Sequence, residues 1–323
     1  MECTFKGKTC RVTSKFLFYL WAFAHGLHEA TRYEMRPSHE ALRMRLTLAA
    51  LAAISLLMLH PAQAGMRAFR VVLDPGHGGV DEGTVHHSGK NKISEKDVTL
   101  ILARTIAKSL RARGFEVHLT REHDETLSLS ERTALANRLK ADVFISLHMN
   151  ATPHGGDTNA RGFETYFLNS TSDESSRRLA QFENSVLGGS EAPALPEANE
   201  GNDVALILKD LRLDANLSES KRLACHLQHQ LVQFTATDPA EVVAESPRNR
   251  GIRQALFYVL LGADMPAALV EAGFLKHPKD RGLVLSAEGQ AKISAALTRA
   301  LERFRLLKGT SQAQQVVSNC KVH

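Results

Sequence analysis

The sequence is poor in cysteine and in aromatic residues. Its 323 residues include 4 Cys and 1 Trp, and aromatic residues make up 6%. So few cysteines exclude a disulfide-dense scaffold and a zinc site built from paired cysteines. Cys225 and Cys320 lie far apart in the C-terminal half. They could form a bridge in an oxidising compartment, but we expect two free thiols, one of them buried.

Long hydrophobic runs and internal repeats are also absent. The longest apolar run, residues 46–59, is shorter than the roughly 20 apolar residues that a membrane-spanning helix needs. Arg43 and Arg45 precede the run, and the small residues Ala62 and Ala64 follow it. This order is typical of a secretory signal cleaved after Ala64, although a buried core helix or a membrane span would also fit. We therefore expect export, with the periplasm as the destination and no stable membrane anchor after cleavage.

A signal sequence begins close to the N-terminus of its precursor, whereas 42 residues precede Arg43 here. Met35 and Met44 are both suitable start residues. We expect residues 1–43 to be an upstream extension and residues 1–64 to be absent from the exported protein.

The excess of positive charge is confined to the N-terminus. The net charge is +5, and residues 1–64 contain 8 Lys and Arg against 4 Asp and Glu. The remainder holds 32 basic and 31 acidic residues, which leaves +1. A nucleic-acid-binding domain needs a basic surface on its folded part, so we expect no nucleic-acid partner.

From residue 70 onward, short apolar runs alternate with amphipathic segments. We expect strands at 70–74, 115–120, 142–148, 163–168, 255–260 and 267–271. We expect helices at 95–113, 128–140, 175–187, 218–234 and 286–307. Strands that are apolar throughout and alternate with helices are typical of parallel sheets covered on both faces. The pattern predicts one α/β domain over 65–308, with a twisted, mostly parallel sheet flanked by helices.

Two segments differ from this pattern. Residues 169–214 are rich in Ser, Glu, Asn, Gly and Pro, and we expect one helix there within a regulatory insertion. Residues 309–323 form a polar tail that we expect to be frayed. In the helix at 128–140, we expect Leu135 and Leu139 to face the core.

Three candidate metal ligands fall at the ends of predicted elements. His77 follows the first strand, Glu95 opens the first helix and His148 ends the third strand. The carboxyl ends of strands border the ligand crevice in open α/β sheets, so these side chains can share one rim. Two imidazoles and a carboxylate form a catalytic zinc set with one coordination position left for water. Alone, each His fits a surface or core residue, and Glu95 fits an acid favoured by the helix dipole.

Glu271 ends the last predicted strand, within Val270–Phe274. A carboxylate at that position is either a general base close to the metal or a salt-bridged strand-end residue. The residue pattern alone leaves both interpretations open.

Four motifs in order resemble those of the zinc-dependent N-acetylmuramoyl-L-alanine amidases, which remodel bacterial peptidoglycan. They are LDPGHGG, SEKDV, SLHMNA and DMPAALVEAGFL, and the similarity extends from Arg70 to Phe304. The resemblance implies a single Zn²⁺ held by His77, Glu95 and His148, with Glu271 as the catalytic base. It also implies hydrolysis of the amide between N-acetylmuramic acid and L-alanine, in wall remodelling or daughter-cell separation.

The resemblance extends to residues outside the ligand set. Asn150 matches a family Asn and is expected to shape the site, and Arg250 lies in a family motif as a candidate for substrate binding. Cell-separation members carry a helix that blocks the zinc until an activator protein displaces it. LAQFEN (179–184) resembles that helix, which makes Glu183 the candidate autoinhibitory ligand. A solvated helix carboxylate is the alternative for Glu183.

The sequence departs from the family at His86 and His87, which replace small residues; we expect both to face water. We also expect no N-terminal targeting domain of the kind that some relatives carry. Two rival functions remain from the motifs alone. One is a zinc peptidase that cuts within the stem peptide, and the other is a non-catalytic wall-binding protein, which predicts missing ligands. The glycine loop lacks the GxGxxG spacing of a dinucleotide binder.

Overall fold

The computed structural model describes residues 4–5, 8–9, 67–151, 159–185, 203–235, 249–308, 310 and 320–322. The chain divides into two units, Met1–Met66 and Arg67–His323. In the first unit, the described residues form a short antiparallel hairpin of β1 (Thr4–Phe5) and β2 (Lys8–Thr9). The signal sequence predicted at 43–64 lies outside the described residues.

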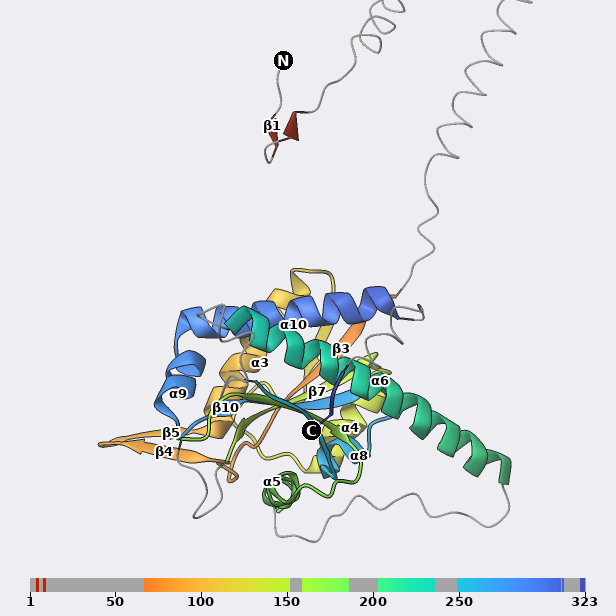
Figure 1. The fold of residues 1–323 in the computed structure, drawn as a ribbon, viewed down its shortest axis with the longest axis horizontal. Helices are drawn as coiled ribbons and strands as arrows, with labels where there is room; N and C mark the ends of the chain where they lie inside the picture. The colour runs from red at the N-terminus through yellow and green to blue at the C-terminus, as the bar shows by residue number, and fades with distance from the viewer. Residues whose placement is uncertain are drawn as a thin grey trace, which may run out of the picture. The chain divides into compact units, whose positions relative to one another are not determined.

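The second unit is built on a six-stranded sheet with the order β6-β3-β7-β10-β8-β9. Its strands are β3 (Arg70–Pro75), β6 (Glu116–Leu119), β7 (Val143–Asn150), β8 (Phe163–Leu168), β9 (Asn249–Ala255) and β10 (Ala267–Phe274). All neighbouring strands are parallel except β8 and β10. The predicted fold, a mostly parallel sheet flanked by helices, is therefore confirmed (Figure 1).

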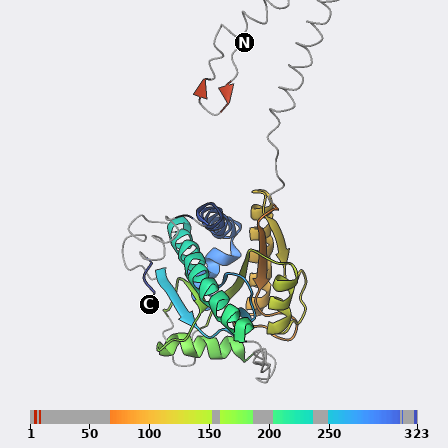
Figure 2. The same cartoon turned by 90° about the vertical axis from the view of Figure 1, so that its right-hand side faces the viewer.

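Helices cover both faces of this sheet. The helices are α3 (Glu95–Arg111), α4 (Leu129–Arg138), α5 (Glu174–Asn184), α6 (Asp203–Thr235), α8 (Tyr258–Leu261), α9 (Pro278–Leu285) and α10 (Ala287–Leu307). One core contains the apolar side chains of α3, α6 and α10, and the other those of α4, α5 and α8. In the first core, α6 and α10 lie side by side (Figures 1 and 2).

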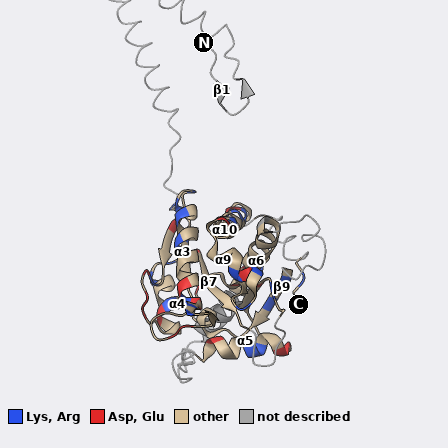
Figure 3. Cartoon of the chain, turned by 90° about the vertical axis from the view of Figure 1, so that its left-hand side faces the viewer, with Lys and Arg blue, Asp and Glu red and all other residues tan. Residues whose placement is uncertain are grey.

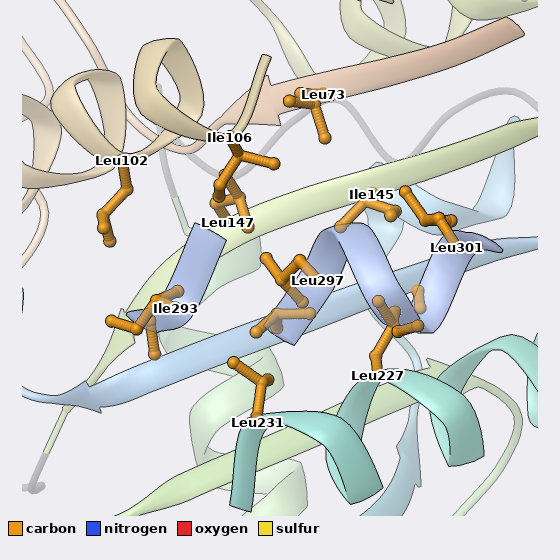
Figure 4. Close-up of a cluster of buried hydrophobic side chains, with 14 of the residues drawn as sticks. Leu73, Leu102, Ile106, Ile145, Leu147, Leu227, Leu231, Ile293, Leu297 and Leu301 are labelled. Carbon is orange, nitrogen blue, oxygen red and sulfur yellow. The ribbon is translucent and has the colours of Figure 1, made fainter. Parts of the chain in front are cut away.

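The larger core forms because each covering helix presents its apolar stripe to the same strands. Leu73 and Ile145 of the sheet face Ile106 of α3, Leu227 of α6 and Leu297 of α10, all fully buried (Figure 4). Each such side chain contributes about 1.5–3 kcal/mol through removal from water. This packing holds the carboxyl ends of β3 and β7, where the candidate ligands lie.

The strand predicted at 255–260 is wrong. The strand is β9, which ends at Ala255, and residues 258–261 form the short helix α8. The apolar run resembled a strand because Phe257, Val259 and Leu260 are buried. β9 itself carries arginines because it is the outermost strand of the sheet.

Leu139 is half-buried and packs against the core of α4, α5 and α8, as predicted, whereas Leu135 is half-buried without joining that core. The buried residues of α4 are Arg132, Thr133 and Ala136. Arg132 also forms an ion pair with the fully buried Asp74, which fixes the helix against β3 through polar contacts.

The two cysteines are paired, contrary to the expectation of free thiols. Cys225 of α6 forms a disulfide with Cys320, across a sequence separation of 95. Val322 then forms a parallel bridge with Ile252 of β9. The described end of the tail is therefore fixed to the domain and is not frayed.

Other predicted elements agree more closely. The helix expected at 175–187 is α5, and the helix expected at 218–234 is the later part of α6, which starts already at Asp203. His86 and His87 lie in the hairpin of β4 (Val85–Ser88) and β5 (Asn91–Ser94), with His86 half-buried and His87 exposed. Within the described residues, no helix is both long and apolar enough to cross a membrane.

Candidate metal centre and active site

Four buried side chains converge at the carboxyl ends of β3 and β7. His77, Glu95, His148 and Glu183 each offer one ligand atom, and these atoms all lie within 4.8 Å of one another. None of the four residues is more than 6% exposed. The structure therefore brings together the three predicted ligands with the candidate autoinhibitory residue.

The contacts between these atoms are short. Glu95 Oε1 lies 3.0 Å from His77 Nε2 and 3.3 Å from His148 Nδ1. Glu183 Oε2 lies 3.2 Å from His77 Nε2 and 2.9 Å from His148 Nδ1. The two imidazole nitrogens and both Glu183 oxygens nevertheless have no hydrogen-bond partner of acceptable geometry among the described residues. Buried polar atoms without partners are costly, and here all of them point to one spot that suits a cation.

Each ligand is fixed by groups outside the cluster. His77 Nδ1 lies 2.6 Å from Asp81 Oδ2, which orients the ring and leaves Nε2 for the centre. Glu95 Oε2 accepts a hydrogen bond from Thr84 N at 2.8 Å, and Oε1 accepts one from Met149 N at 2.7 Å. The donor set of imidazoles and carboxylates is the one that zinc prefers.

The backbone at the end of β3 is shaped to present His77. His77 has φ of 59°, in the left-handed region that few side chains adopt. Two buried arginines hold this turn. Arg132 donates to the carbonyl oxygen of His77 at 2.9 Å, and Arg121 donates to the carbonyl oxygen of Gly76 at 2.9 Å.

Two glycines are required by close packing around the ligands. A Cβ on Gly76 would lie 2.5 Å from the His148 ring, and a Cβ on Gly83 would lie 2.6 Å from His77 Cδ2 and 2.7 Å from Glu95 Oε2. Real Cβ atoms do not approach so closely. The glycine-rich loop therefore exists to let backbone pass directly beside the ligands.

Glu271 lies next to the cluster, in β10. It is the Cα partner of His148 in the parallel β7–β10 pair, so both side chains leave the sheet on the same face. The residue is fully buried, and neither carboxylate oxygen has a hydrogen-bond partner among the described residues. Burial and the neighbouring Glu183 carboxylate raise the pKa of Glu271 well above its usual range. Both effects favour the protonated form of the Glu271 carboxyl group while Glu183 lies beside it.

The two other predicted site residues meet on a residue that sequence reasoning missed. Asn150 Nδ2 and Arg250 Nε both donate to Glu164 of β8, the latter at 2.8 Å. Glu164 is 2% exposed and is the Cα partner of Glu271 across the antiparallel β8–β10 pair. Glu164 lies at the start of a predicted strand, one residue after Phe163, where a polar residue is ordinary, so the sequence carried no signal of this role.

Residues 71–303 match the family model described as N-acetylmuramoyl-L-alanine amidase. The chain belongs to this family. The amidase AmiC of Neisseria meningitidis is 30% identical over 236 residues, which cover 72% of this chain and 52% of that protein. AmiA of Escherichia coli is 29% identical over 231 residues, which cover 70% of this chain and 73% of that protein. This chain thus matches about half the length of the Neisseria relative.

Solved structures of amidases share the fold. An N-acetylmuramoyl-L-alanine amidase from Clostridium difficile 630 matches with a TM-score of 0.53 and 28% identity, over 75% of this chain and 99% of that chain. AmiC2 of Nostoc punctiforme matches with a TM-score of 0.51 and 26% identity, over 74% and 97%. The amidase domain of this protein is therefore the region with the six-stranded sheet and the cluster of His77, Glu95 and His148.

Proposed function

We propose that this protein is an exported, zinc-dependent amidase that hydrolyses the bond between N-acetylmuramic acid and L-alanine in peptidoglycan. The observation that carries the proposal is the convergence of His77 Nε2, Glu95 Oε1 and His148 Nδ1, buried and adjacent to Glu271. A non-catalytic wall-binding protein would have no use for such a cluster. Family membership supports the choice of amide.

His77, Glu95 and His148 would hold the zinc ion. When bound, zinc supplies Lewis acidity that polarises the scissile carbonyl and acidifies water. Glu271 takes the proton of the attacking water as the C–O bond forms. It then donates that proton to the L-alanine nitrogen as the C–N bond breaks, so the products are the lactyl carboxylic acid, which ionises by releasing its proton, and a free amine.

Glu183 is proposed as an autoinhibitory ligand. Its carboxylate lies where a substrate carbonyl would have to approach, 2.9 Å from His148 Nδ1 and 3.2 Å from His77 Nε2. At 4% exposure it is not a solvated helix carboxylate. An activator protein that draws α5 away would open the site. Such activation of the enzyme would take place during wall remodelling or daughter-cell separation.

Export is proposed from two independent features. Residues 43–64 have the order of a secretory signal. The disulfide of Cys225 with Cys320 requires an oxidising compartment, such as the periplasm.

Digestion of purified sacculi, followed by mass spectrometry, tests the function. We expect intact stem peptides that begin with a free L-alanine amine, and no release when a chelator is present. Fragments cut within the stem peptide would assign a zinc peptidase instead. The absence of any released fragment from a Glu183→Ala protein reconstituted with zinc would contradict the proposal.

A further inference from the structure

Arg250 lies on the same rim of the sheet as the candidate metal ligands. β8 runs antiparallel to β10, and β9 runs parallel to β8, so the first residues of β9 lie beside the carboxyl ends of β7 and β10. Arg250 is the second residue of β9. It is therefore separated from Glu271 by one intervening strand, roughly 10 Å in the plane of the sheet.

The guanidinium of Arg250 is fixed by contacts with Glu164 and Phe274. Its Nε donates to Glu164 Oε1 at 2.8 Å, and its Cζ lies 5.1 Å from the centre of the Phe274 ring. Phe274 follows Glu271 by three positions on β10, so the side chain leans across β8 toward the candidate base. Among the described residues, Arg250 makes no other hydrogen bond, and 30% of its side chain is exposed.

Glu164 is already saturated by donors. Besides Arg250, its carboxylate accepts from Asn150 Nδ2 and from Tyr166 Oη at 3.1 Å, and Arg253 Nε lies 3.2 Å away. The carboxylate thus fixes Arg250 through Nε alone. The two terminal nitrogens, which form the fork that pairs with a carboxylate, are left to face the rim.

Arg253 provides a contrast within the same cluster. Its guanidinium contacts Glu164 on one side and donates from Nη1 to Asp173 at 3.0 Å on the other. A terminal nitrogen of Arg253 is therefore used inside the protein, and 18% of its side chain is exposed. Figure 3 shows acidic and basic residues intermingled over the helices of this unit.

We propose that Arg250 is a specificity-determining residue that binds the free carboxylate on the second residue of the stem peptide, with Glu164 as its positioning residue. This inference rests on the proposed amidase function. In an extended chain, each residue spans about 3.5 Å, so the second residue begins about 3.5 Å beyond L-alanine. The carboxylate of the second residue therefore lies roughly 7 Å from the scissile nitrogen. The long side chain of Arg250 covers the rest of the separation from Glu271.

Kinetics with three synthetic muramoyl tripeptides test the proposal. In the first, both peptide carboxylates are free; in the second, only the second residue is amidated; in the third, only the terminal carboxylate is amidated. We expect kcat/KM to be about 10- to 100-fold higher for the first than for the second, mainly through KM. Arg250→Gln should bring this ratio close to one, Arg250→Lys should retain part of it, and the third substrate should behave like the first.

Arg253→Gln is the matched control, because it removes the same charge from the same cluster. We expect it to keep the ratio of kcat/KM between the first and the second substrate. A ratio unchanged in Arg250→Gln, an equal fall on all substrates, or dependence on the terminal carboxylate would overturn the proposal. Calorimetric binding of the free and amidated tripeptides gives a readout that needs no turnover. If nothing is cleaved even by a zinc-reconstituted protein that carries Glu183→Ala, but Arg250→Gln removes the binding ratio, the amidase function fails and the subsite stands.

Discussion

Glu271 and His148 are direct neighbours in adjacent parallel strands, although 123 positions separate them along the chain. The pairing puts a candidate base beside a candidate metal ligand on one face of the sheet. A strand register is rigid, because slipping it by one residue would send every side chain to the opposite face. The relation between base and metal is therefore fixed by the core rather than by loops.

Glu271→Gln should abolish turnover while the protein still binds zinc. The amide has the shape of the carboxyl group but cannot accept the water proton, and positioned proton transfer contributes roughly 10²- to 10⁴-fold to rate. We expect a fall of about 10³-fold in sacculus digestion with zinc content unchanged. Glu288→Gln, an exposed change on α10, is the control and should be silent. Full activity in Glu271→Gln would remove its assigned role.

Gly76→Ala should lose zinc without unfolding. The added Cβ would lie 2.5 Å from the His148 ring, so the ring must move away from the ligand cluster. We expect zinc per protein to fall severalfold, as measured by elemental analysis after dialysis. The control is Gly282→Ala in α9, where a Cβ meets no atom within 4 Å. Normal zinc content in Gly76→Ala would show that the ring position does not matter.

Glu183→Ala should raise basal activity, because it removes the carboxylate that lies among the imidazole nitrogens. Glu174→Ala is the matched control on the same helix, since Glu174 is exposed and pairs only with Arg177 and Arg178 among the described residues. Dye release from labelled sacculi measures both variants. An unchanged rate in folded Glu183→Ala would argue against autoinhibition.

Weakening the attachment of α5 to the domain should also raise basal activity. Asn184 ties the end of this helix to the segment after β9, donating to the Leu256 carbonyl oxygen at 2.8 Å and accepting from Tyr258 N at 2.8 Å. Asn184→Ala removes both bonds and leaves Glu183 itself intact. It is thus a second variant for the same prediction, with an increase smaller than that of Glu183→Ala.

Replacing both cysteines by serine should destabilise the domain. The Cys225–Cys320 bridge closes a loop with a sequence separation of 95, and loops of that size are stabilised by about 4 kcal/mol through restriction of the unfolded chain. Thermal unfolding should occur at a lower temperature in the double variant. A phosphine reductant should lower the transition of the original protein and leave the variant unaffected. Equal transitions for both proteins would exclude the bridge.

His226 should make stability depend on pH. Burial, assisted by the positive charge of Arg222, lowers the pKa of His226 to about 4, against 6.5 for the free side chain. The unfolded chain then binds a proton that the folded chain does not, so this contribution to stability is complete above pH 6.5 and is lost as pH falls toward 4. The slope is at most about 1.4 kcal/mol per pH unit. In urea unfolding, His226→Gln should weaken the fall of the free energy of unfolding between pH 6.5 and 4. The same fall in both proteins would contradict the assignment.

The ligand-bearing elements could be predicted from sequence because local and global signals agree there. Residues 70–74 and 142–148 are apolar because both faces of a central strand are buried, and their polar ends mark the rim. The same logic failed at 249–261. β9 lies at the edge of the sheet and carries Arg250 and Arg253. The apolar residues that follow it form a single turn of helix and are buried there.

Features that depend on long-range pairing could not be predicted. The bridge of Cys225 with Cys320 depends on how α6 meets the end of the tail, which the local sequence does not determine. Glu164 resembled an ordinary polar position in a strand, and its importance is visible only when Asn150 and Arg250 are seen to meet on it. The proximity of Glu183 to the imidazoles could be expected only from resemblance, because its own helix is amphipathic and unremarkable in sequence.

The proposed function requires that one zinc ion is shared by three residues distant in sequence. Anomalous diffraction at the zinc absorption edge, from crystals of the zinc-reconstituted protein, tests it most directly. We expect a single strong peak within bonding distance, about 2.0–2.2 Å, of His77 Nε2, His148 Nδ1 and a Glu95 oxygen. A peak at other residues, or none at this cluster while the protein retains lytic activity, would contradict it.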